Sequence, residues 1–349
     1  MSSNSLLEEK AAYERIHENA QRVLCEIGIN LTDTPELMEL LMEADAIDFE
    51  ATDAVLVPLR RDYVAQCLAL VPRKMPLHTW EITFGTGSWP PFLGQAGTEV
   101  DRPATADEFR QIAQLAASHA DVVGVFSAPV MVDRNLSDFG CAQIMDQHFD
   151  GLKMITTRRM SDQEAGSFRG RHDWLDIVSL LGGLTPMSTM VEPFLRSCRL
   201  GNQVLLLDMS IAGVTAPQSP EALLTLSHAQ ELFMIVVAQT VTPGLVCVNS
   251  AIPGPLCPLT DNLSYSQPAL TMVNAAMARL NQWVTGLPSC QSGGSTSEAQ
   301  DVDLAAQESA FHRNVMRNLG VPMVRHSLGT MGDLNYFNID KVSNAKVFK

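Results

Sequence analysis

The sequence predicts an α/β protein built as a (β/α)8 barrel of the TIM type, preceded by a helical extension. Short apolar runs, typical of strands that are buried on both faces, recur along the chain and alternate with helical patterns. About eight such runs occur, which is the strand number of this barrel, and the 349 residues exceed the ~250 that it usually needs. We expect residues 1–75 to form the helical extension and residues 76–349 to form the barrel domain.

Three helices are expected in the extension. Residues 11–27 carry apolar side chains at helical spacing and stop at Gly28, a residue that often ends a helix. Asp33–Glu36 and Pro58–Asp62 contain the small polar and proline residues that start helices, so they mark the second and third helices. We expect this small helical unit to pack on the outside of the barrel.

The strands of the barrel are expected to alternate with helices that have recognisable starts. Thr105–Glu108 and Ser161–Glu164 are capping boxes, in which a hydroxyl and a glutamate side chain satisfy the first backbone N–H groups of a helix. Ser219–Pro220 and Ser266–Pro268 are further start signals. The expected strands are residues 78–84, 122–126, 152–155, 187–191, 204–207, 245–248, 288–290 and 321–324.

A doubly wound open sheet is the alternative fold. Such a sheet normally carries a glycine-rich phosphate-binding loop after its first strand. Gly85–Gly87 lacks the third glycine of that fingerprint. The closed barrel is therefore the fold that we expect.

Composition and charge exclude several classes of protein. The net charge of −15 argues against nucleic-acid binding, which needs clustered Lys and Arg. The seven cysteines are scattered without a CxxC pair, which fits a reducing compartment, and the polar first residues do not resemble a signal peptide. The most apolar run, Leu232–Ala238, is too short to span a bilayer. We expect a cytoplasmic protein without membrane contact and, because no HExxH or CxxC occurs, without a local metal motif.

In such a barrel the functional residues follow the strands. Glu192 and Asp208 each stand directly behind an expected strand, where a carboxylate is costly unless it is paired. Either acid could pair with Arg158, Arg196 or Arg325, or it could serve as the counter-charge for a cationic substrate. The sequence leaves both interpretations open.

Two loops of small residues also follow expected strands. Glycine lets the backbone approach a flat ligand closely, although the same residues can simply form a tight turn. His326 follows the last expected strand, whereas most other histidines lie in helical patterns. The candidate residues of the two loops are Gly213, Thr215, Gly293, Gly294, Ser295 and Thr296.

Several segments resemble the trimethylamine methyltransferase family, the corrinoid-dependent MttB-like proteins. Glu14–Ala46 and Val57–His78 are similar to that family's opening helices. Ile211–Pro217 is similar to its AGATAP loop, and Gly244–Pro255 and Gly293–Asp301 are similar to its later strand-end loops. The resemblance covers nearly the whole chain through the order and spacing of these segments.

The resemblance implies a TIM barrel that transfers a methyl group from a small methylated or quaternary amine to Co(I) of a corrinoid. The cofactor would be cobalamin or a related corrinoid, held by a partner corrinoid protein or free, and the small-residue loops would face it. Glu192 and Asp208 would be the catalytic counter-charges, and a homo-oligomer is expected. The residues proposed to bind the substrate are Trp89, Phe126, Asn249, Tyr265 and His326.

Two departures from the family pattern refine this expectation. The trimethylamine enzymes carry pyrrolysine, whereas this sequence has only standard residues, which favours the branch associated with glycine betaine and related quaternary amines. The chain is also shorter at its C-terminal end than a typical member. Two alternatives therefore stay open: a catalytically inactive, truncated paralogue that binds small amines, and a TIM-barrel lyase that uses Glu192 or Asp208 as a general base.

Overall fold

A computed structural model gives the structure of the chain. It describes residues 3–47, 55–73, 83–87, 90–94, 102–119, 123–128, 131–132, 135–180, 182–257 and 262–343. Trp89 and residues 74–82, which include most of the first expected strand, lie outside these residues.

Three helices lead into the barrel, at the positions that the sequence predicts. They are α1 (Ser3–Arg22), continued by a π-helical turn η1 (Val23–Ile27), α2 (Pro35–Glu43) and α3 (Arg61–Leu70). Gly28 ends the first helix with φ of +95°, and a Cβ there would lie 2.4 Å from the backbone carbon of Val57. This close approach lets the strands β1 (Ile29–Asn30) and β2 (Leu56–Val57) pair antiparallel.

Eight parallel strands form the barrel. Their order is β10-β8-β7-β6-β5-β3-β14-β13, and a single parallel bridge between Asn249 and Ser289 joins the two ends of the sheet. The prediction of a (β/α)8 barrel is therefore confirmed, and the ring of parallel strands is nearly closed. The strands are β3 (Thr83–Thr86), β5 (Val123–Ser127), β6 (Leu152–Ile155), β7 (Trp174–Val178), β8 (Val204–Leu206), β10 (Cys247–Asn249), β13 (Cys290–Ser292) and β14 (Met323–Leu328).

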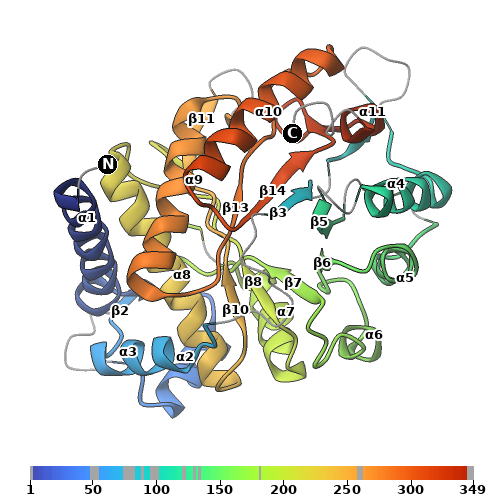
Figure 1. Cartoon of the computed structure of the whole chain (residues 1–349). Coiled ribbons are helices and arrows are strands. Elements are labelled where there is room, and N and C mark those ends of the chain that lie inside the picture. The colour runs from blue at the N-terminus through green and yellow to red at the C-terminus, as the bar shows by residue number, and fades with distance from the viewer. Residues whose placement is uncertain are drawn as a thin grey trace.

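Helices surround the strands on the outside (Figure 1). Both predicted capping boxes form, at the starts of the helices that follow Thr105 and Ser161. In Figure 1, α1–α3 lie beside α8 on one side of the barrel, and α4–α6 lie on the opposite side. The outer helices are α4 (Ala106–Ser118), α5 (Asp138–His148), α6 (Asp162–Gly166), α7 (Ser188–Leu200), α8 (Pro220–Val241), α9 (Pro268–Leu280) with the π-helical turn η2 (Asn281–Thr285), α10 (Val302–Asn318) and α11 (Ile339–Ser343).

Two small sheets are built from the loops that follow the barrel strands. One has the order β12-β11-β9 and the other the order β15-β16-β4. Because these loops leave the carboxyl ends of the strands, both sheets lie at the end of the barrel where active sites form. Their strands are β9 (Ile211–Ala212), β11 (Gly254–Cys257), β12 (Asn262–Leu263), β15 (Thr330–Met331), β16 (Tyr336–Phe337) and β4 (Phe92–Leu93).

One expected strand is wrong, and this changes the position of a candidate residue. Residues 188–191 form the first turn of helix α7, Met187 is its N-cap, and the strand lies earlier, at β7. Val191, Leu195 and Cys198 form the buried stripe of α7, so the apolar run belongs to a helix. Pro193 lies within this helix instead of ending a strand. Asp176 interrupts the apolar run of β7, which hides that strand in the sequence.

Helix α8 is the most deeply buried helix next to the extension. Among the described residues it is the one helix that is long and apolar enough to cross a membrane, but 83% of its apolar window is buried inside the protein. Its buried residues pack with the buried residues of α2 and α3 in one cluster. Its composition is therefore that of a core helix.

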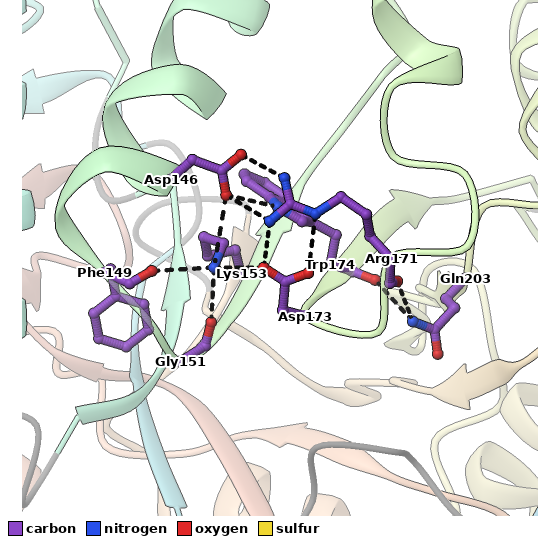
Figure 2. Close-up of polar contacts among 8 residues, drawn as sticks. All are labelled: Asp146, Phe149, Gly151, Lys153, Arg171, Asp173, Trp174 and Gln203. Carbon is purple, nitrogen blue, oxygen red and sulfur yellow. Dashed lines mark hydrogen bonds and ion pairs between the residues drawn. The ribbon is translucent and has the colours of Figure 1, made fainter.

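An ion-pair network holds the amino ends of β6 and β7 against α5 (Figure 2). Lys153 is 2% exposed, and its Nζ lies 2.8 Å from Oδ2 of Asp173 and 3.7 Å from Oδ1 of Asp146. The same ammonium donates to the carbonyls of Phe149 and Gly151, at 3.0 and 3.1 Å. This end of the barrel is opposite to the loops, so the network serves stability.

Replacing Lys153 by methionine is expected to lower the free energy of unfolding by about 1.5 kcal/mol. Two carbonyls lose a donor, whereas Asp146 and Asp173 keep their ion pairs with Arg171. Urea unfolding followed by circular dichroism would measure the change. The exposed Lys10→Met serves as the matched control, with a change within about 0.5 kcal/mol. An equal loss in both variants would contradict a stabilising role of the buried network.

Candidate active site

Apolar side chains fill the interior of the barrel. Any ligand therefore has to bind above this layer, at the carboxyl ends of the strands. The side chains that meet inside are Val125, Leu152, Met154, Leu175, Ile177, Leu205, Val248, Cys290 and Met323.

Arg325 lies directly above this layer on β14. Met323 packs inside the barrel and Val324 packs against the outer helices, so the alternation of the strand turns Arg325 inward. Its side chain is 1% exposed. Burial lowers the pKa of Arg325, while the Cys290 thiol and the Tyr265 phenol act in the opposite direction. All three groups are therefore close enough to interact.

Tyr265 and His326 form the aromatic part of the same cluster. Their rings meet edge to face, with the centroids 6.0 Å apart. His326 Nδ1 lies 2.8 Å from Oγ of Ser292, and burial together with the neighbouring Arg325 holds the pKa of His326 well below its usual range. The Tyr265 hydroxyl is buried and has no hydrogen-bond partner among the described residues. Two residues that the sequence proposes for substrate binding are thus neighbours.

Asp333 fixes the segment that carries Tyr265. Its Oδ1 accepts hydrogen bonds from the backbone N–H of Tyr265, at 2.9 Å, and from Oγ of Ser297, at 2.6 Å. Asp333 is 4% exposed and has φ of +51°, a conformation that aspartate tolerates better than most residues. The loop after β14 therefore positions the tyrosine across the end of the barrel.

The loop Gly293–Thr296 is buried by packing. A Cβ on Gly293 would lie 2.9 Å from the side chain of Met316, and Gly294 has φ of +98°. Thr296 Oγ1 donates to Glu308, whereas the buried Ser295 hydroxyl has no partner among the described residues. The glycines let the loop fit tightly against α10 and β14, and Gly293, Gly294, Ser295 and Thr296 do not form an exposed rim.

The second predicted loop is exposed. Gly213 and Thr215 lie in a tight turn in which the backbone N–H of Gly213 donates to the carbonyl of Ala216, at 2.7 Å. The turn follows β8 and presents Met209 and Val214, which are 41% and 59% exposed. This loop is the uncharged, small-residue rim that the sequence predicts.

Asp208 is a buried carboxylate that turns toward α8. It accepts hydrogen bonds from Ser227 and from the hydroxyl and the backbone N–H of Ser210. Burial raises the pKa of Asp208 to about 6, against these bonds and with a smaller contribution from Glu231. The serines supply the hydrogen bonds expected from an arginine, and Arg196 instead donates to backbone carbonyls.

Glu192 does not lie at a strand end, because its segment is helical. Its side chain is 67% exposed on α7 and forms a surface ion pair with Arg199, at 3.2 Å. An exposed carboxylate on the outer helix cannot serve as the counter-charge inside the barrel. The same exposure removes Glu192 as the base of the lyase alternative, which leaves Asp208 as its only candidate among the two acids.

Two further predicted residues point away from the barrel mouth. Phe126 packs between Phe109 and Phe149 on the outer face of β5, with ring centroids 6.4 and 5.4 Å away. Asn249 donates from Nδ2 to Oδ1 of Asn281 on η2, at 2.7 Å. Both predictions place the residue correctly near a strand end but on the wrong face.

A buried polar cluster behind β10 is not apparent from the sequence. Glu231 Oε1 accepts from the backbone N–H of Ala251 at 2.9 Å, and its Oε2 lies 3.6 Å from Nδ1 of His228. His228 Nε2 in turn lies 2.9 Å from Nδ1 of His17 on α1. Burial raises the pKa of Glu231 to about 8. The only sequence signal is a short polar stretch inside the apolar helix α8.

The part of the chain that the structure describes holds no group of three His, Cys, Asp or Glu side chains able to bind a metal ion. The chemistry available at the carboxyl ends of β13 and β14 is therefore a buried cation, an aromatic pair with one neutral imidazole, and a phenol that still offers a hydrogen bond. These groups can bind and orient a small polar molecule.

Comparisons with solved structures agree with this architecture. The monomethylamine methyltransferase MtmB of Methanosarcina barkeri superposes with a TM-score of 0.58 at 12% identity, over 93% of this chain and 69% of that one. A hydroxylamine complex of MtmB gives a TM-score of 0.61 at 12% identity, over 96% and 72%. At this identity the similarity establishes the fold.

Sequence comparison establishes the family. A glycine betaine methyltransferase of Desulfitobacterium hafniense (strain Y51) is 26% identical over 364 residues, which cover 96% of this chain and 73% of the relative. The sequence model of the trimethylamine methyltransferase (MTTB) family matches residues 3–342. This barrel, with its Tyr265–His326–Arg325 cluster, is therefore a methyltransferase that belongs to the trimethylamine methyltransferase family.

Proposed function

We propose that this methyltransferase moves a methyl group from a small quaternary or methylated amine of the glycine betaine type to Co(I) of a corrinoid protein. The observation that carries the proposal is the Tyr265–His326–Arg325 cluster at the carboxyl ends of the strands, in a chain of this family. An aromatic face attracts a quaternary ammonium group through its π-electrons. The similarity to a glycine betaine methyltransferase supports this choice of substrate.

The corrinoid enters as the methyl acceptor, carried by a partner. The rim that follows β8 suits such a broad, flat molecule, because residues 209–220 carry no charged side chain. Met209 and Val214 expose apolar surface there, and Gly213 adds no side chain that would project from the turn. We propose that this rim meets the corrinoid protein, and that the cluster around Tyr265 holds the amine.

The reaction needs no nucleophile from the chain. The N–C bond breaks, the bonding electron pair stays on nitrogen as a tertiary amine leaves, and Co(I) supplies the pair for the new bond to the methyl carbon. The residues of the chain position the amine and exclude water from its methyl group. The apolar layer beneath Arg325 closes the barrel from below, so the amine can be reached only from the loop side.

We also place the reaction in the cytoplasm. No disulfide joins any of the seven cysteines, all of which lie in the described part of the chain. Thiols that stay reduced are typical of a reducing compartment.

Incubation with cob(I)alamin tests the proposal. The full chain is mixed with glycine betaine and reduced cobalamin without oxygen, and the absorbance change to methylcobalamin is followed together with dimethylglycine formation. We expect both products in equal amounts, and none when the chain is omitted. Tyr63→Phe, which removes a hydroxyl that contacts Thr240 on the outer helices, should keep the full rate.

Two results would overturn the proposal. Consumption of the betaine without any corrinoid would indicate another reaction on this barrel. Binding of the betaine without methylcobalamin formation, also in the presence of a family corrinoid protein, would indicate the inactive paralogue that the sequence leaves open.

A further inference from the structure

The rim that follows β8 is a compact turn that holds its own shape. Three consecutive backbone N–H groups donate to the carbonyl of Ile211, at 3.0 to 3.1 Å: those of Val214, Thr215 and Ala216. The N–H of Ile211 in turn donates to Oγ1 of Thr215, at 2.9 Å. Because these bonds close within the turn, its place above the barrel depends on residues 208–210, which attach it to β8.

Asp208 anchors this attachment to helix α8. Its carboxylate accepts hydrogen bonds from Oγ of Ser227 on α8, and from Oγ and the backbone N–H of Ser210, at 3.2 and 3.3 Å. Gln230, also on α8, donates from Nε2 to Oγ of Ser210, at 2.8 Å. All four side chains are at most 2% exposed, so water does not replace these bonds. A carboxylate suits this place because it only accepts, and three donors meet it.

The backbone of the same attachment holds the neighbouring loop. The N–H of Ile252 donates to the carbonyl of Asp208, at 2.8 Å, and the N–H of Gly254 donates to the carbonyl of Ser210, at 3.1 Å. Directly beyond them β9 and β11 pair in parallel, with Ile211 opposite Gly254. The loops after β8 and β10 therefore form one small sheet, and the Asp208 carboxylate fastens that sheet to α8.

The alternation of the backbone links the anchor to the exposed surface. Asp208 and Ser210 are buried, whereas Met209 between them is 41% exposed on the rim. Tyr265 has an anchor of its own, because its backbone N–H donates to Asp333, at 2.9 Å. The Asp208 carboxylate therefore fixes the rim, and Asp333 fixes the aromatic cluster.

We propose that Asp208 is a positioning residue that holds the rim on α8 and thereby sets the affinity of the enzyme for the corrinoid and not for the amine. The inference rests on the proposed function, in which the rim meets the corrinoid. Asp208 touches neither reactant, and it acts through Ser210 and Met209.

Binding measurements on the full chain test this role. Equilibrium dialysis gives the Kd of hydroxocobalamin, and isothermal titration gives the Kd of glycine betaine. In Asp208→Asn the N–H and the two hydroxyls compete for a single oxygen, so we expect the Kd of hydroxocobalamin to rise about tenfold and that of glycine betaine to stay within about twofold. Ser227→Ala removes one donor and should raise the Kd of hydroxocobalamin about threefold.

Three results would overturn the inference. The first is an unchanged Kd of hydroxocobalamin in Asp208→Asn, and the second is an equal loss of both ligands in that variant. The third is the absence of hydroxocobalamin binding to the unchanged chain, because the rim would then offer the corrinoid no surface.

Asp176→Asn separates positioning from a general loss of stability. It changes a buried aspartate that also accepts three hydrogen bonds, between β7 and α7, and it should leave the Kd of hydroxocobalamin unchanged. Hydrogen exchange adds a local readout: in Asp208→Asn the amides of Ile252 and Gly254 should exchange faster, and the amide of Tyr265 should not. Weaker hydroxocobalamin binding in Asp176→Asn, to the same extent, would contradict the assignment.

Steady-state kinetics distinguishes this inference from the proposed reaction. With glycine betaine and cob(I)alamin, Asp208→Asn should raise the KM for cob(I)alamin about tenfold and keep kcat within about twofold. If hydroxocobalamin binding falls in Asp208→Asn but the unchanged chain transfers no methyl group, the proposed reaction fails while the positioning role stands. If the unchanged chain transfers the methyl group and Asp208→Asn keeps its KM for cob(I)alamin, the positioning role fails while the reaction stands.

Discussion

Asp176→Ala is expected to lower the free energy of unfolding by about 4 kcal/mol, the largest loss of stability that we predict for a single residue. The carboxylate lies fully buried on the outer face of β7, where it accepts three hydrogen bonds. Thr157 donates from its backbone N–H and its hydroxyl, at 2.9 and 2.6 Å, and Ser197 donates from its hydroxyl, at 2.5 Å. Alanine leaves all three donors buried without an acceptor and creates a cavity among β6, β7 and α7.

Chemical denaturation followed by tryptophan fluorescence measures this effect. Asp150, an exposed aspartate before β6, provides the matched control, because Asp150→Ala should change stability by less than about 0.5 kcal/mol. Asp176→Asn keeps one acceptor oxygen and should lose about 2 kcal/mol. A loss below about 1 kcal/mol for Asp176→Ala would show that Thr157 and Ser197 find other acceptors, and that the carboxylate does not join the strands to α7.

Asp176 also explains where prediction from the sequence fails. A parallel strand is recognised as a continuous apolar run, and Trp174–Val178 is such a run except for this one acid. The neighbouring apolar segment of α7 offers a more continuous pattern, although its buried residues repeat at helical spacing. The sequence therefore predicts a strand where helix α7 begins, and it places Glu192 at a strand end that does not exist. The predicted number of strands and the barrel fold are still correct, because the other seven expected strands still alternate with helices.

The candidate site shows a different limit. The sequence can show that a residue follows a strand, and on this basis it proposes Tyr265 and His326 as substrate-binding residues. In the structure the two rings are neighbours. The direction of a side chain depends on the register of the strand to within one residue. Phe126 and Val125 illustrate this, since Val125 fills the barrel while Phe126 packs on Phe109 outside it. The sequence places Arg325 after the last expected strand and offers it as a possible salt-bridge partner, but nothing in the sequence shows that its strand turns it inward.

Raising the pH from 6.5 to 8 is expected to lower the free energy of unfolding by about 2 kcal/mol through Glu231 alone. Burial raises the pKa of Glu231 to about 8, from an ordinary value of 4.5. The folded protein therefore keeps a proton that the unfolded chain has already lost. This contribution is fully present below pH 4.5 and is lost as the pH rises through 8, at up to about 1.4 kcal/mol per pH unit.

Among these buried groups, Glu231 is the one whose titration lowers stability most in the window above pH 6.5. Burial lowers the pKa of His17 to about 4 and of His228 to about 3, so their contribution is lost as the pH falls through 6.5, and its small remaining part still rises with pH in this window, opposite to the effect of Glu231. Asp208, with its pKa raised to about 6, has already lost most of its contribution by pH 6.5. Glu231→Gln keeps an oxygen for the N–H of Ala251 and should abolish the fall in stability between pH 6.5 and 8.

Urea unfolding at four pH values between 6.5 and 8 gives the slope directly. Glu192→Gln is the matched control, because that glutamate is exposed and its removal should leave the slope unchanged. A slope that persists in Glu231→Gln would mean that the proton is held elsewhere, and the junction between α1 and α8 would then not depend on a neutral acid. A slope that disappears would show that a carboxyl group on α8 is kept protonated at neutral pH, beside the His17–His228 contact that joins α1 to α8.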